Sequence, residues 1–179
     1  MSSKASQKRA LIIHTAIRLI QENDLNSLTL EGVAGKAGIS KGGLLYYFKT
    51  KDALQSAIAE TIMEEVMESY KAIASQEQGA GRLTRGFIVG SRKDLMEGAR
   101  LNIAIQIMQN EYTKMTDDYE CFLEDLMNDG LEESSVHLIR LTIDGLYYSK
   151  LLNIAPVSEE IAEQVFEQLL EMTRKDNVS

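Results

Sequence analysis

The segment that most constrains the fold is SLTLEGVAGKAGISKGGLLYYFKTKDAL, residues 27–54. Thr29 is a good N-cap for a first short helix, and Gly38 can end that helix in the left-handed conformation. Ile39 would then plug the core, and Ser40 is a natural N-cap for a second helix. The spacing therefore predicts two short helices joined by a glycine turn.

The second of these helices has an outward surface suited to nucleic acid. Leu44, Leu45 and Phe48 include the packing positions at helical spacing. A lysine can donate to a phosphate or to guanine O6 and N7, glycines let a helix approach a groove closely, and a tyrosine hydroxyl can donate from a flat apolar body. The positions left facing outward are Lys41, Gly42, Tyr46 and Tyr47.

The stretch AGISKGGLLYYFKTKDAL, preceded by an amphipathic helix at Lys8–Glu22, resembles the DNA-binding signature of TetR-type (TetR/AcrR) transcriptional regulators. Beyond residues 8–54 the chain resembles the family in being helical, in its length and in an Asp-Gly-Leu at 144–146. The resemblance implies an all-α fold of about nine helices. A DNA-binding domain with a helix-turn-helix, residues 1–51, would precede an effector-binding and dimerisation domain, residues 52–179.

The resemblance also implies which residues contact DNA, with some departures. Gly43 and Leu45 replace the family's usual Thr and Tyr, so two phosphate-contacting hydroxyls are missing, and Lys49 replaces the usual Pro. Backbone N–H groups, both tyrosines and Lys51 would grip the phosphates instead. The predicted DNA-contact residues are Thr29, Glu31, Ser40, Lys41, Gly42, Gly43, Tyr46, Tyr47, Lys49 and Lys51.

Glu31 lies where family members often place a base-contacting polar or basic side chain. A carboxylate there repels phosphate but can accept from cytosine N4, so it would confer selectivity rather than affinity. The alternative is a solvated residue that favours the dipole of its helix.

Charge is unevenly distributed along the chain. The net charge is −8, but residues 1–51 carry eight Lys or Arg and three acids, or +5, which leaves −13 for residues 52–179. A basic N-terminal part on an acidic body would orient the molecule with that part toward DNA phosphates.

Composition narrows the class of protein. Hydrophobic residues make up 44% and Pro156 is the only proline, which favours an all-α fold. Cys121 is the only cysteine, and neither His14 nor His137 has a local metal-ligand spacing or a nucleophile motif nearby, so we expect no enzyme, no metal and no cofactor. With no apolar run near the ~20 residues of a membrane span and no signal-peptide core, we expect a cytoplasmic protein.

The body should contain further helices near 52–75, 82–95, 99–110, 113–129, 133–153 and 158–174. The last two have too many apolar residues for one narrow stripe, which implies a second buried face. In the family such helices pair with their copies in a homodimer, as a four-helix bundle, and Gly145 would permit close approach. The alternative is that these residues fill the core of the monomer.

The middle helices are where the family binds small effectors. Asp144 lies within an apolar helix and needs a partner, either a neighbouring Arg or Tyr or a cationic effector group. Basic residues such as Arg82 and Arg92 could instead bind an anionic effector, which is a further alternative. The predicted effector-binding residues are Phe87, Ile103, Ile107, Met108, Tyr112, Met127, Asp144, Tyr147 and Tyr148.

These patterns favour a ligand-responsive transcriptional regulator, a repressor released from a pseudo-palindromic double-stranded DNA operator by a lipophilic small molecule. The alternative is an architectural or division-linked DNA-binding protein whose body binds a protein partner. The first predicts an enclosed apolar cavity in the body, and the second predicts a filled core with an exposed apolar patch.

Overall fold

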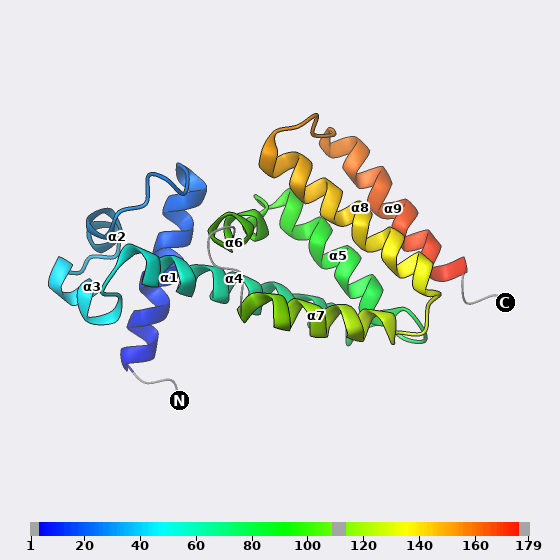
Figure 1. Ribbon diagram of the computed structural model, residues 1–179, viewed down its shortest axis with the longest axis horizontal. Helices are drawn as coiled ribbons and strands as arrows, with labels where there is room; N and C mark the ends of the chain where they lie inside the picture. The colour runs from blue at the N-terminus through cyan, green and yellow to red at the C-terminus, as the bar shows by residue number, and fades with distance from the viewer. Residues whose placement is uncertain (1–3, 109–113, 176–179) are drawn as a thin grey trace. The chain divides into compact units, whose positions relative to one another are not determined.

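The computed structural model describes residues 4–108 and 114–175, and this part of the chain is helical with no β-strand (Figure 1). None of the described helices is long and apolar enough to cross a membrane. The predicted all-α class is confirmed, and helix bounds fall within a few residues of those expected. The helices are α1 Lys4–Glu22, α2 Leu30–Lys36, α3 Lys41–Tyr47, α4 Lys51–Ala74, α5 Arg82–Met96, α6 Arg100–Met108, α7 Lys114–Met127, α8 Glu133–Leu152 and α9 Glu159–Lys175.

The described residues form two compact units. The head unit comprises residues 4–63 together with 103–108, and the body unit comprises residues 64–102 together with 114–175. This division falls inside α4, between Met63 and Glu64. The functional boundary expected after Lys51 stays a prediction.

The head unit is built on the apolar face of α1. Ile13, Ile17 and Ile20 are buried, and α2 packs against α1 and α3. From the first half of α4, Leu54 and Ile58 are fully buried. The guanidinium of Arg9 lies 5.3 Å from the centre of the Phe48 ring, a cation–π contact.

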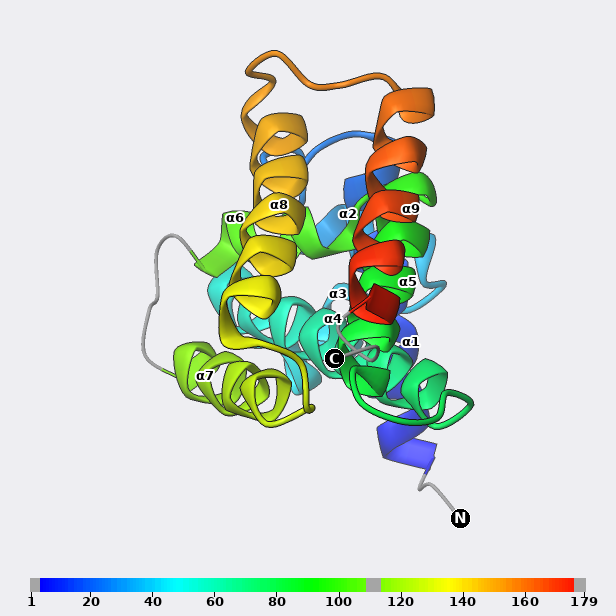
Figure 2. The ribbon, with the colours of Figure 1, turned by 90° about the vertical axis from the view of Figure 1, so that its right-hand side faces the viewer.

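In the body unit, α5 packs against α8 and α9, and α7 packs against α5 and α8 (Figures 1 and 2). The rings of Tyr70, Phe87 and Phe122 meet in its core with centroids 5.3–5.8 Å apart. Glycine is required where α4 meets α5, since a Cβ on Gly86 would lie 2.4 Å from the Tyr70 carbonyl oxygen. The backbones of α4 and α5 therefore approach closely at Tyr70, whose ring belongs to the aromatic cluster.

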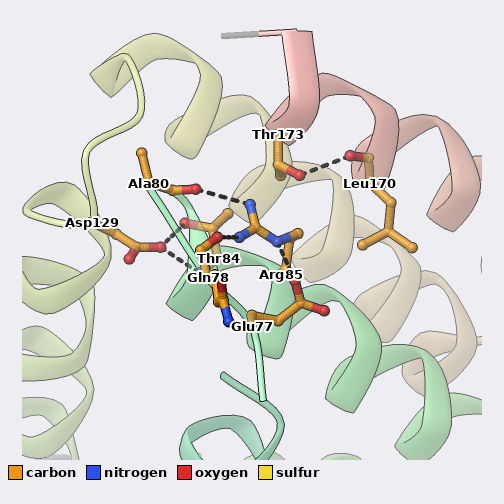
Figure 3. Close-up of polar contacts among 8 residues, drawn as sticks. All are labelled: Glu77, Gln78, Ala80, Thr84, Arg85, Asp129, Leu170 and Thr173. Carbon is orange, nitrogen blue, oxygen red and sulfur yellow. Dashed lines mark hydrogen bonds and ion pairs between the residues drawn. The ribbon is translucent and has the colours of Figure 1, made fainter. Parts of the chain in front are cut away.

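A polar cluster fixes the beginning of α5 (Figure 3). Arg85 is only 6% exposed and donates to the carbonyl oxygens of Ala80 and Gln78 and to the Glu77 carboxylate at 2.8–2.9 Å. The Asp129 carboxylate accepts from the Thr84 backbone N–H at 2.7 Å and from its hydroxyl at 3.0 Å. Charged hydrogen bonds therefore tie the beginning of α5 both to the loop before it and to the segment after α7.

Candidate functional site

Two capped helix N-termini organise the surface of the head unit. The Thr29 hydroxyl accepts from the Gly32 N–H, and the Ser40 hydroxyl accepts from the Gly43 N–H, each at 3.1 Å. Gly38 has φ +67°, so the turn between α2 and α3 uses the left-handed conformation predicted from the sequence. Both short helices are therefore capped at the N-terminal end, where Glu31 and Lys41 lie.

Of the four α3 positions expected to face outward, three are exposed and Tyr47 is half-buried. Leu44 and Phe48 are buried, while Ile39 and Leu45 are half-buried. Lys41 and Gly42 are exposed, Tyr47 is half-buried, and Tyr46 is 80% exposed with its ring edge-to-face against that of Tyr47. The Tyr46 ring is therefore accessible from solvent.

A groove of about 480 Å³ runs beside this face. Its lining includes Lys8 from α1, which sequence reasoning had not placed among the contact residues, although the polar face of the first helix was a signal for it. The ammonium group of Lys8 is a cation that can attract phosphate, and it lines the same groove as Tyr46 and Tyr47. The lining residues are Lys8, Gly38, Ile39, Ser40, Gly43, Tyr46 and Tyr47.

The connection from α3 to α4 places further charge on the head unit. Lys49 is exposed and Lys51, the first residue of α4, is half-buried. The Thr50 hydroxyl accepts from the Ala53 N–H at 3.0 Å and so caps α4. All ten predicted DNA-contact residues thus belong to the head unit, and their roles remain predictions.

Glu31 and Lys41 form a contact that the sequence did not show. The Lys41 Nζ lies 2.5 Å from the Glu31 Oε1, and the hydrogen bond to Lys41 lowers the pKa of Glu31. Both side chains remain more than half exposed. Glu31 is therefore ionised at neutral pH and lies beside the first residue of α3.

The predicted effector residues of the body unit separate into different environments. Phe87 is buried in the ring cluster, Met127 is half-buried, and Tyr147 is 2% exposed with its hydroxyl donating to the Asp94 carboxylate at 3.0 Å. Burial raises the pKa of Tyr147, so its hydroxyl stays protonated. Tyr148, one residue later, is 48% exposed, so the structure does not bring it to the same place.

Asp144 has an Arg and a Tyr of the chain itself as partners, as the first of the two alternatives for it proposed. Its carboxylate accepts from Arg140 at 2.9 Å and from the Tyr119 hydroxyl at 3.5 Å. Burial raises the pKa of Asp144, and it also raises the pKa of Tyr119, to about 12. The carboxylate is therefore satisfied within the chain.

The remaining predicted effector residues lie elsewhere. Ile103 is buried and Ile107 and Met108 are half-buried, and all three belong to the head unit. Tyr112 lies outside the described residues.

A cavity of about 150 Å³ in the body unit is lined mainly by polar and charged groups and includes none of the predicted effector residues. One side is formed by Arg100, which pairs with Glu65, and another by Asp94, which accepts from the backbone N–H groups of Arg100 and Leu101 at 3.1 and 3.2 Å. In the sequence, the available signal for it was the charged pair Lys93 and Glu97, four residues apart at the end of α5. The lining is Glu65, Val66, Ser69, Tyr70, Gly90, Lys93, Asp94, Glu97 and Arg100.

Two family models match the chain. The model described as "Bacterial regulatory proteins, tetR family" matches residues 12–58, which include the helix-turn-helix, and "Tetracyclin repressor-like, C-terminal domain" matches residues 81–174. The chain belongs to the TetR family. It is therefore a TetR-family transcriptional regulator, and members of this family bind operator DNA and small molecules and typically form dimers.

Curated relatives and solved structures agree with this membership. The HTH-type regulator YvdT of Bacillus subtilis, itself uncharacterised, is 24% identical over 142 residues, which cover 76% of this chain and 73% of YvdT. RutR of Escherichia coli is 34% identical over 71 residues, 40% of this chain and 34% of RutR.

Among solved structures, a TetR regulator of Haloarcula marismortui has a TM-score of 0.72 at 18% identity, covering 96% of this chain and 98% of that one. The multidrug binding protein EbrR complexed with ethidium has a TM-score of 0.64 at 19% identity, covering 90% of this chain and 97% of EbrR. These two structures show that the TetR fold is shared.

Proposed function

We propose that the chain is a ligand-responsive repressor that binds a pseudo-palindromic operator as a homodimer. The observation that carries the proposal is the exposed face of α3, where the side chains of Lys41 and the 80% exposed Tyr46 flank the exposed Gly42 on a helix with a capped N-terminus. The +5 charge of residues 1–51 favours docking of this face on DNA phosphates.

Within the head unit, the residues divide by the group they would reach. Lys51, Tyr47 and Lys8 would contact phosphates, because they border the groove or lie at the beginning of α4. Lys41, at the first position of α3, would reach base edges in the major groove.

The proposed dimer uses α8 and α9, which lie side by side in the body unit (Figure 2). Leu138, Leu141, Tyr148 and Leu152 are each 48–57% exposed and, with Gly145, repeat along α8 at intervals of three and four residues. That spacing forms one apolar stripe of the kind that pairs helices. Ile161 on α9 is 45% exposed, and a Cβ on Gly145 would meet only open space, so a partner helix can approach closely.

The proposed effector is a lipophilic small molecule that binds within residues 82–150. The multidrug binding protein EbrR was solved with ethidium, which is an aromatic cation. In this chain the −13 charge of residues 52–179 and the tyrosines of the body favour a cation. The ligand would prefer a conformation in which α4 holds the two heads at a spacing unsuited to the operator.

A second candidate function remains an architectural or division-linked DNA-binding protein. Two observations favour it: the rings of Tyr70, Phe87 and Phe122 pack against one another in the body core, and the α8 stripe is exposed. A protein partner would then occupy that stripe in place of a second copy.

Reciprocal binding measurements distinguish these functions. The operator is first selected from random duplexes. Calorimetry then measures the affinity of the whole chain for tetraphenylphosphonium, a lipophilic cation that is not flat, with and without that operator. We expect operator to weaken cation binding, and cation to weaken operator binding, by the same factor, about 5–150-fold. Equal affinities would make the cation an occupant and not an inducer, and no binding would favour the protein-partner function.

A further inference from the structure

An exposed ion pair joins the two helices of the helix-turn-helix. Glu31 is the second residue of α2, Lys41 is the first residue of α3, and the charged ends of their side chains meet at 2.5 Å. The side chains are 62% and 59% exposed, respectively. Since Thr29 and Ser40 cap these helices, the backbone is fixed where the pair begins while the charged groups remain in solvent.

The two groups have complementary hydrogen-bonding capacity. A lysine ammonium only donates, and an ionised carboxylate only accepts. In the major groove, guanine presents its O6 and N7 acceptors, and cytosine presents an N4–H donor. A donor and an acceptor held side by side match the two halves of a G·C base pair.

We propose that Glu31 and Lys41 act as one unit that reads a G·C base pair, with Lys41 donating to guanine and Glu31 accepting from cytosine N4. The inference rests on the proposed operator binding and names a sequence element that the operator should contain. It makes Glu31 a specificity-determining residue whose effect depends on Lys41.

The electrostatics of the pair favour selection over general attraction. Its net charge is zero, so it adds little to the sequence-independent attraction of phosphates. The carboxylate also repels phosphate and so disfavours movement of Lys41 onto the DNA backbone. An exposed ion pair contributes little to stability, so both groups can exchange their mutual contact for base contacts without unfolding the head.

Operator selection with the whole chain tests the coupling. Glu31→Ala and Lys41→Ala should each reduce discrimination at the same G·C base pair about tenfold, and the double variant should lose no more than either single variant. The matched control is the exposed pair of Glu22 and Lys36, which meets at 3.0 Å with side chains 53% and 50% exposed. Alanine at both control positions should leave the sequence preference unchanged.

Modified bases test the individual atoms. N4-methylcytosine at the identified base pair should weaken binding by the unmodified protein but not by Glu31→Ala, and 7-deazaguanine should weaken binding by the unmodified protein but not by Lys41→Ala. Circular dichroism confirms that each variant is folded before binding is measured.

Two results would overturn the proposal that Glu31 and Lys41 act as one unit, while leaving operator binding intact. One is a Glu31→Ala variant that binds every duplex more tightly with the same preference, and the other is single variants that change preference at different base pairs. Sequence-independent binding by the unmodified protein would overturn the proposed function along with this inference.

Discussion

Replacing Arg85 with Met tests how the polar cluster before α5 stabilises the body. The side chain is 7% exposed and makes three hydrogen bonds of 2.8–2.9 Å, two to loop carbonyls and one to Glu77. Methionine has a similar helix propensity and cannot donate, so the change removes these bonds with little effect on the helix itself.

The expected loss in the free energy of unfolding follows from the hydrogen-bond partners that Arg85 leaves unsatisfied. Hydrogen bonds to a charged group contribute about 1.5–3 kcal/mol each, so three give an upper limit of roughly 4.5–9 kcal/mol. The Glu77 side chain is 40% exposed and regains water, and removing the guanidinium also removes its own burial penalty. We therefore expect a loss of about 3 kcal/mol in the free energy of unfolding, near the lower end for breaking a buried pair.

Chemical and thermal unfolding of the two variants measure this loss. The control is Arg92→Met, because Arg92 pairs with the carboxylates of Glu163 and Glu167 but has a side chain that is 33% exposed. We expect Arg85→Met to lower the melting temperature by about 6–12 °C, and Arg92→Met to lose only about 0–1 kcal/mol. Equal losses for the two variants would refute the reasoning that burial gives the Arg85 cluster its importance.

Three further predictions concern DNA contact, assembly and pH. Lys51→Ala and Tyr47→Ala should weaken binding to all duplexes alike, whereas Lys41→Ala should change preference by ~1–3 kcal/mol at one base pair; selection experiments showing the opposite assignment would reverse these roles. Leu141→Glu places a charge on the exposed α8 stripe and should yield a folded monomer in analytical ultracentrifugation, while an unchanged dimer would place the interface elsewhere. Burial raises the pKa of Asp144 in the folded state above its usual value of 3.8, so the folded state binds a proton more readily than the unfolded state. The free energy of unfolding should therefore fall as pH rises from the unfolded-state pKa of Asp144 to its folded-state pKa. Asp144→Asn should flatten that part of the stability–pH curve measured by urea unfolding, and an unaltered curve would assign the dependence to other groups.

Local signals in the sequence predicted much of the head. Thr29, Gly38 and Ser40 act within three or four residues of themselves, so their side-chain chemistry identifies the caps and the turn before any tertiary structure is known. The buried Leu44 and Phe48 follow from helical periodicity in the same way.

Contacts between distant segments could not be read from the sequence. The pairing of Glu31 with Lys41 depends on the angle between α2 and α3, and the place of Lys8 in the groove depends on how α1 packs.

In the body, composition suggested an apolar effector site but could not orient the helices. Successive residues of a helix point about 100° apart, so Tyr147 enters the core and Tyr148 faces solvent. Asp144 was correctly expected to need a partner, but the choice of Arg140 and Tyr119 required the helix geometry.

The salt dependence of operator binding tests the central claim most directly. Affinity of the whole chain for its selected operator, and for a duplex carrying one half-site, is measured across a range of salt concentrations. We predict that log K falls linearly with log salt, by about 0.9 for each phosphate contacted, with two chains bound per operator and much weaker binding to the half-site. A flat salt dependence, or tight binding of a single chain to the half-site, would contradict the account.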